Sequence, residues 1–221
     1  MDNGLFEELF PFWVDLTNNQ KDRIAENITH NVYEPGQRVH GGYEDCTGVI
    51  IVKEGRLRVY LLSEDGKEVT LFRLIENDAC LLSASCIIKN ISFDVYVDTE
   101  NTTELYILNA AVYDKIAKEN PKVANCMTEL LSMRFSEAMW VMEQILFMKL
   151  DKRLALFLLN QASLEGGDDI NLTHQQIAGH IGSAREVVTR MLKYFANEGV
   201  ISVNRKGIKI LDRKKMAAFA D

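Results

Sequence analysis

The sequence predicts an α+β protein in which an N-terminal antiparallel β-roll (a jelly-roll) precedes one long helix and a C-terminal winged helix-turn-helix. Three observations support this fold class. Short β-rich runs alternate with Gly-bearing turns between residues 31 and 108, residues 122–165 contain neither Pro nor Gly, and two short amphipathic segments meet at Gly182. We therefore expect a β-roll domain with N-terminal helices over 1–120, the long helix over 121–150 and the winged domain over 151–221.

The first 30 residues are expected to form short helices. "TNNQ" at 17–20 has the Ser/Thr-x-x-Glu/Gln form of a capping box, and Ile24 and Ile28 follow one turn apart. The β-rich runs come next: "VIIV" at 49–52, "RLRVYLL" at 56–62 and "EVTLFRLI" at 68–75. Because "SEDGK" separates the last two runs, we expect them to pair as a hairpin. Many short strands between such turns are typical of a sandwich or jelly-roll.

The long helix is expected to begin near Pro121, a residue that the first helical turn tolerates. Along it, mostly apolar residues recur in steps of three and four, with one arginine among them. We predict that this seam is a dimer interface, formed by Met127, Leu131, Arg134, Ala138, Val141, Ile145 and Met148. The opposite register is also largely apolar, so one face would pack on the β-domain of the same chain and the other on a partner subunit. A helix buried within a monomer is the alternative.

Two capping boxes mark the predicted helix-turn-helix. Thr173 is followed by Gln176, Ser183 is followed by Glu186, and Gly182 lies between the two helical segments. The segment "VISVNRKGIKI" at 200–210 then predicts a hairpin around "NRKG", which is the wing.

Charge is distributed unevenly along the chain. Residues 149–221 hold 12 Lys and Arg against 8 Asp and Glu, a net of +4, whereas residues 1–148 carry −11. An acidic body with a basic end fits a protein that meets a polyanion with one end only. No run approaches eighteen apolar residues and the N-terminus is acidic, so we expect neither a membrane span nor export. Four cysteines in 221 residues favour a cytoplasmic protein with reduced thiols.

The second helix of the motif divides into two faces. Val188, Met191, Leu192 and Phe195 are expected inside, while charged and polar residues point outward. An α-helix fits the major groove of DNA, where Arg pairs with guanine and Glu accepts from cytosine. We therefore predict double-stranded DNA as the partner, contacted by Thr173, His174, Ser183, Arg185, Glu186, Thr189, Arg190, Lys193, Arg205 and Lys206. The alternative is a solvated face on which Glu186 pairs with Arg190 or caps its own helix.

The segment "LTHQQIAGHIGSAREVVTRMLKYFANEGVISVNRKGIKI" resembles the winged helix-turn-helix of the CRP/FNR family of bacterial transcription regulators, and "RLALFLLNQA" resembles the family's first DNA-domain helix. The resemblance is specific in the last 70 residues and architectural in the first 120. Arg185, Glu186 and Arg190 match the base-reading positions of the cyclic-AMP receptor branch, whereas Val187 departs from the usual Thr. The resemblance implies a homodimeric activator or repressor on a palindrome with TGTGA- or TTGA-like half-sites. It implies RNA polymerase as a further partner if the protein activates.

The β-roll lacks the residues that bind cyclic nucleotides in these relatives. Their Gly-Glu pair falls on Leu81 and Leu82, and their phosphate-binding Arg falls on Ser92. Ala138 and Met139 stand where the receptor's long helix offers Thr-Ser to adenine. We therefore do not expect cyclic AMP. No cysteine precedes Cys46, so an N-terminal iron–sulfur cluster is not supported either, and the cofactor is unknown.

An unidentified small-molecule effector or the thiol redox state is expected to act on the segment around "CLLSASC". Cys80 and Cys86 form a redox pair, join Cys46 or Cys126 in a metal site, or lie reduced in the core; all three readings stay open. The predicted effector or redox residues are Cys80, Leu81, Leu82, Cys86, Phe93 and Met139.

No enzyme is expected, because the sequence has no nucleophile elbow, P-loop or GxGxxG motif in the right context. The alternatives are a jelly-roll (cupin-like) metal-binding protein or a regulatory module that binds a small molecule. The four histidines are single and scattered, a pattern that does not favour a cupin metal site. We predict no metal site.

Overall fold

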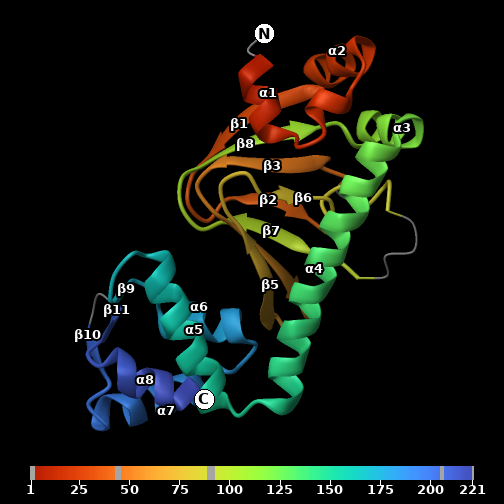
Figure 1. The fold of residues 1–221 in the computed structure, drawn as a ribbon. Helices are drawn as coiled ribbons and strands as arrows, with labels where there is room; N and C mark the ends of the chain where they lie inside the picture. The colour runs from red at the N-terminus through yellow and green to blue at the C-terminus, as the bar shows by residue number, and fades with distance from the viewer. Residues whose placement is uncertain (1–2, 43–45, 89–92, 205–206, 221) are drawn as a thin grey trace. The chain divides into compact units, whose positions relative to one another are not determined.

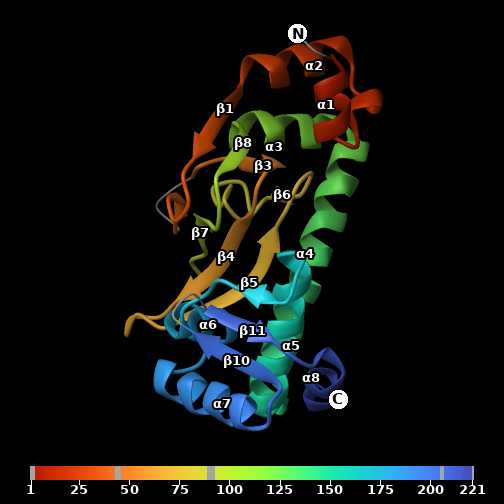
Figure 2. The same ribbon diagram turned by 90° about the vertical axis from the view of Figure 1, so that its left-hand side faces the viewer.

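The computed structural model describes residues 3–42, 46–88, 93–204 and 207–220. The chain forms two compact units (Figures 1 and 2). The first comprises residues 1–62 and 71–138, and the second comprises residues 63–70 and 139–221. No helix in the described ranges is long and apolar enough to cross a membrane.

The first unit is built on an antiparallel β-sandwich. Its strands are β1 (Ile28–Tyr33), β2 (Arg38–Gly41), β3 (Val49–Glu54), β4 (Leu57–Leu62), β5 (Glu68–Leu74), β6 (Ala79–Cys80), β7 (Tyr96–Thr99) and β8 (Thr103–Leu108), of which β5 belongs to this unit from Leu71 onward. Among the described residues, one sheet has the order β1-β8-β3-β6 and the other β2-β7-β4-β5. The non-consecutive neighbours are the crossovers of a jelly-roll, so the predicted fold class is confirmed. The "SEDGK" turn joins β4 to β5 with a hydrogen bond from the Ser63 amide to the Lys67 carbonyl.

Side chains from both sheets fill the sandwich. Strand β3 reads as a continuous apolar run because both of its faces are buried, with Ile50 and Val52 fully enclosed. They meet Leu105 of the neighbouring β8, together with Leu57 and Val97 of the other sheet, in one cluster.

Helices cover one edge of the sandwich beside β1 and β8 (Figure 2). They are α1 (Asn3–Leu9), a 3-10 turn (Trp13–Asp15), α2 (Asn18–Glu26) and α3 (Ala110–Glu119). The capping box predicted at Thr17 and Gln20 is present, so the start of α2 is confirmed. Phe6, Phe10 and Trp13 stack together within this part of the core.

Helix α4 (Pro121–Phe147) begins at the predicted proline. Val123 is fully buried, and Met127 and Leu131 pack beside it against the core of the first unit. Arg134 is buried on the same face, where its guanidinium donates to Asp78 and Glu137 at 3.0 and 2.9 Å. The helix face that carries the predicted dimer seam is therefore packed, over its first half, against the chain's own β-roll.

A different face of α4 is exposed. Thr128, Ser132, Phe135, Met139, Met142 and Leu146 recur in steps of four and three, and all six are exposed. Phe135 is 67% exposed and Leu146 is 61% exposed. These six residues, the exposed seam, have the spacing of a coiled-coil contact line.

The second unit contains the predicted winged domain. Its elements after α4 are α5 (Leu150–Leu164), β9 (Asp169–Ile170), α6 (His174–Ile181), α7 (Arg185–Asn197), β10 (Ile201–Asn204), β11 (Gly207–Ile210) and α8 (Arg213–Ala220). Leu158, Ile177, Val188, Leu192 and Phe195 are fully buried in one core, which fixes α6 and α7 on α5.

Candidate nucleic-acid interface and β-roll pocket

The turn between α6 and α7 is set by local chemistry. Thr173 caps α6, accepting from the Gln176 amide while Gln176 accepts from the Thr173 amide, so this predicted capping box is confirmed. Gly182 ends the helix with φ 62° and ψ 48°, a left-handed conformation that favours glycine. The Arg153 guanidinium donates to the Ile181 carbonyl beside this turn.

The second predicted capping box is wrong. Helix α7 begins at Arg185 with Ala184 as its N-cap, and no side chain caps it. Ser183 belongs to the preceding turn, where its amide donates to the Ala178 carbonyl instead. Glu186 therefore lies in the first turn without a capping hydrogen bond. Its negative charge there interacts favourably with the positive end of the helix dipole.

The outward face of α7 has the composition that the sequence predicts. Arg185, Glu186, Arg190 and Lys193 are exposed and Thr189 is half-buried, opposite the buried Val188, Leu192 and Phe195. Within the described part of the chain, no carboxylate lies within ion-pair distance of Arg185, Arg190 or Lys193, and Glu186 is not paired with Arg190. We call Arg185, Glu186, Thr189, Arg190 and Lys193 the recognition face. Its charged side chains are available to contact a ligand.

His174 joins α6 to this face. Its Nδ1 lies 2.9 Å from the Thr189 hydroxyl, so the half-buried threonine has a partner within the motif. Burial, together with the positive charge of Arg185, lowers the pKa of His174 below its ordinary value. This shift favours the neutral imidazole, which shares a hydrogen bond with the Thr189 hydroxyl.

The wing is present as β10 and β11, paired in antiparallel register from Ile201–Ile210 to Asn204–Gly207. Strand β9 extends the sheet through Ile170 and Ile208. The predicted contacts Arg205 and Lys206 lie outside the described residues.

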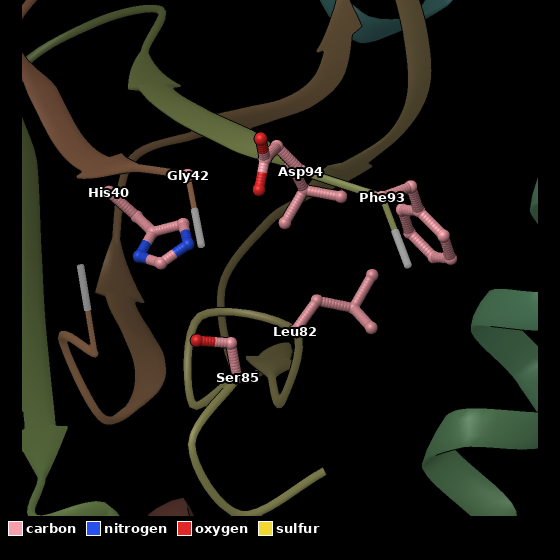
Figure 3. Close-up of a pocket in the computed structure, with 7 residues that line it drawn as sticks. His40, Gly42, Leu82, Ser85, Phe93 and Asp94 are labelled. Atoms are coloured by element: carbon pink, nitrogen blue, oxygen red, sulfur yellow. The ribbon is translucent and has the colours of Figure 1, made fainter. Parts of the chain in front are cut away.

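A pocket opens in the first unit, between strand β2, the turn after β6 and the segment before β7 (Figure 3). It is a shallow pocket lined by His40, Gly42, Leu82, Ser85, Phe93, Asp94 and Val95, and the space among these side chains, open solvent included, is about 220 Å³. Its walls combine apolar side chains with one carboxylate, one imidazole and one hydroxyl. Among the described residues, the lining includes no Lys or Arg.

Only some of the predicted effector residues line the pocket. Leu82 and Phe93 line the pocket, whereas Leu81 is buried in the core of the first unit. Met139 is 40% exposed on α4, and Ser92 lies outside the described residues. Sequence reasoning missed His40, Gly42, Ser85, Asp94 and Val95, which only the tertiary fold brings together.

Of the three readings left open, the Cys80–Cys86 pair is not formed and Cys80 lies reduced in the core, whereas the expectation of reduced thiols is wrong for two of the four cysteines. Cys86 forms a disulfide with Cys46, whereas Cys80 is free and 1% exposed. The reason is that Cys80 ends strand β6 and is buried in the sandwich core, while Cys86 is an exposed residue of the segment that follows. Burial raises the pKa of the Cys80 thiol. The described residues hold no group of three or more His, Cys, Asp or Glu arranged to bind a metal ion.

Known proteins share this architecture. Residues 152–219 match the Crp-like helix-turn-helix domain. The crystal structure of a protein from Eubacterium rectale, assigned to the crp/fnr family of transcriptional regulators, has a TM-score of 0.94 and 46% sequence identity, covering 96% of this chain and 98% of that one. The global nitrogen regulator of Synechococcus elongatus is 24% identical over 189 residues, which are 81% of this chain and 84% of that protein.

The cAMP-activated global transcriptional regulator CRP of Haemophilus influenzae is 25% identical over 178 residues, 78% of this chain and 79% of that protein. The β-sandwich, the long helix and the Crp-like motif together define a DNA-binding transcription regulator and not an enzyme. The chain belongs to the CRP/FNR family of transcription regulators.

Proposed function

We propose that this regulator acts as a homodimer on a palindrome with TGTGA- or TTGA-like half-sites about one helical turn apart. The recognition face carries the proposal: Arg185, Glu186 and Arg190 are exposed on one side of α7 and are not paired with one another. Arg fits guanine in the major groove and Glu fits the cytosine amino group, so this trio favours a G·C-containing half-site. Such a protein works in the cytoplasm, where the DNA lies, and contacts RNA polymerase where it activates.

The exposed seam supports the dimer. Phe135, Met139, Met142 and Leu146 would each lose water on pairing with a second α4, and the heptad spacing brings the same positions of two parallel helices together. Two recognition helices on a two-fold axis then match the symmetry of a palindrome. This seam, rather than the predicted one, is our proposed interface.

The pocket supports control by a small molecule other than cyclic AMP. Leu82, Phe93 and Val95 supply apolar contact, while Asp94 is the acidic group of the lining. The apolar contacts and the acidic side chain of this lining favour a neutral or cationic molecule over a cyclic phosphate. Thiol redox state in the β-roll is the second proposed input.

The test is fluorescence anisotropy of the full chain on a labelled duplex with TGTGA and TCACA half-sites, at fixed salt, in reduced and in mildly oxidised samples. A duplex with scrambled half-sites is the control. We expect the palindrome to bind on the order of a thousandfold more tightly than the control in at least one sample. Equal affinity for both duplexes in both samples would contradict the half-site assignment.

A further inference from the structure

Cys46 and Cys86 differ from the other two cysteines in access to solvent. Both are exposed and their Cα atoms are 5.9 Å apart, within the usual span of a disulfide. Cys80 is fully enclosed and Cys126 is half-buried, and burial raises the pKa of both free thiols. Because the thiolate is the reactive form and must be reached by its partner, the exposed pair is where small thiols and disulfides react.

The disulfide joins two walls of the β-roll pocket. Cys86 directly follows the lining residue Ser85, and Cys46 lies four residues after the lining residue Gly42. Figure 3 shows His40 and Gly42 on one side of the pocket and the loop with Leu82 and Ser85 below it. His40 Nδ1 also lies 3.0 Å from the hydroxyl of Thr47, the residue after Cys46. A change at the disulfide therefore acts on residues of the pocket lining and on their sequence neighbours.

The same two segments are tied a second time without sulfur. The buried Ser83 hydroxyl donates to the Gly48 carbonyl at 2.7 Å, and the Gly48 amide donates to the Ser83 carbonyl at 3.3 Å. Strands β3 and β6 pair next to these bonds, with Ile50 opposite Cys80. Reduction breaks none of these contacts, so the reduced chain keeps its fold and loses only the covalent link at the pocket.

Building on the function proposed above, we infer that Cys46 and Cys86 are a reversible thiol–disulfide switch. The switch controls the mobility of the pocket walls and, through them, the affinity for DNA. The oxidant is a low-molecular-weight disulfide. One cysteine thiolate attacks it, forms a mixed disulfide and releases one small thiol; the second cysteine then attacks the mixed disulfide and releases the other. Two protein sulfurs lose two electrons, the small disulfide gains them, and the two thiol protons leave on the two small thiols.

The test equilibrates the 221-residue chain with buffers of different reduced-to-oxidised glutathione ratio. Three readouts are taken: the number of alkylated thiols, hydrogen exchange of the amides in 46–48 and 82–86, and the dissociation constant on the TGTGA palindrome. The variants are Cys46→Ser/Cys86→Ser and, as the matched control, Cys126→Ser.

We expect the thiols of Cys80 and Cys126 alone to be alkylated after denaturation of the oxidised protein, and all four cysteines after reduction. On reduction the probed amides exchange about tenfold faster, and the dissociation constant changes about tenfold, a typical allosteric coupling. Cys126→Ser keeps this response. Cys46→Ser/Cys86→Ser loses it and behaves as the reduced protein does in either buffer.

A redox response that persists in Cys46→Ser/Cys86→Ser would overturn the inference, as would an unchanged DNA affinity of the wild type in the two states. If no sample prefers the palindrome, the proposed function fails instead. Hydrogen exchange then decides separately whether the pair controls the pocket.

Discussion

The recognition face and the β-roll pocket are assembled in opposite ways. All side chains of the recognition face come from one short stretch of α7, where the helical period alone separates them from the buried Val188 and Leu192. The pocket is lined from three separate stretches, 40–42, 82–85 and 93–95, which meet only after both sheets have formed. A surface of the first kind follows from local sequence, whereas the second depends on long-range pairing.

The largest expected effect concerns the proposal that two recognition faces, one from each subunit, bind DNA together. We expect Met142→Glu to place like charges across the exposed seam and to convert the proposed dimer to a monomer. Affinity for the palindrome then falls by about 100-fold or more, because the two half-sites are no longer bound jointly. Light scattering measures the molecular mass and fluorescence anisotropy measures the affinity for DNA.

Met133→Glu is the matched control for Met142→Glu: Met133 is 54% exposed against 48% for Met142, but it lies off the exposed seam. A dimeric Met142→Glu protein would rule out this interface.

Arg185→Ala tests whether a single side chain of the recognition face contacts a base by itself. Loss of one bidentate guanine contact is expected to cost about 1–3 kcal/mol of binding free energy, and to relax the preference at one base position. Anisotropy on duplexes with single base changes measures both effects. Lys214→Ala, at an exposed position of α8, should bind like the wild type. An equal loss on every duplex would reduce Arg185 to a phosphate contact.

The dependence of the pocket on distant contacts is tested by Ser83→Ala. Removing the hydroxyl that holds the Gly48 carbonyl should lower the free energy of unfolding by about 1–2 kcal/mol. Urea unfolding, followed by tryptophan fluorescence of Trp13 and Trp140, measures it. In Ser163→Ala the deleted hydroxyl is exposed and bonds only within its own helix, so the change should be near zero. Equal values for the two variants would show that the pocket turn is held locally.

The smallest expected effect concerns His174 and pH. Its folded pKa is lowered, so the unfolded chain takes up the proton first as the solution is acidified. The contribution of His174 to stability is present above its ordinary pKa and is lost as the pH falls toward the folded pKa. Between about pH 7.5 and 5.5, His174→Gln should therefore lose less stability than the wild type. The shift in urea midpoint over that range measures the difference, and identical shifts would contradict it.

Local patterns gave the correct helices, hairpin and wing because each depends on neighbours in sequence. The capping box at Thr173 is one case, since both of its bonds lie within four residues. The boundary of α7 was harder: Ser183 and Ala184 both precede the helix, and the pattern does not show which one ends the turn.

Two expectations could not be settled from periodicity. Helix α4 has two mostly apolar faces, and spacing does not tell which one the β-roll covers; the Arg134 contact with Asp78 decides that in the folded chain. The disulfide was equally hidden, because Cys46 is 40 residues from Cys86 and meets it only through the pairing of β3 with β6.

The disulfide lies within one chain, and this arrangement sets the kinetics of the inferred switch. Once one sulfur has formed a mixed disulfide, ring closure is a first-order event whose rate does not depend on protein concentration. A cell with few copies of the regulator would close the bond as quickly as a cell with many. Each proposed dimer would also carry two such disulfides. Dimers with one disulfide would therefore exist between the fully reduced and the fully oxidised forms.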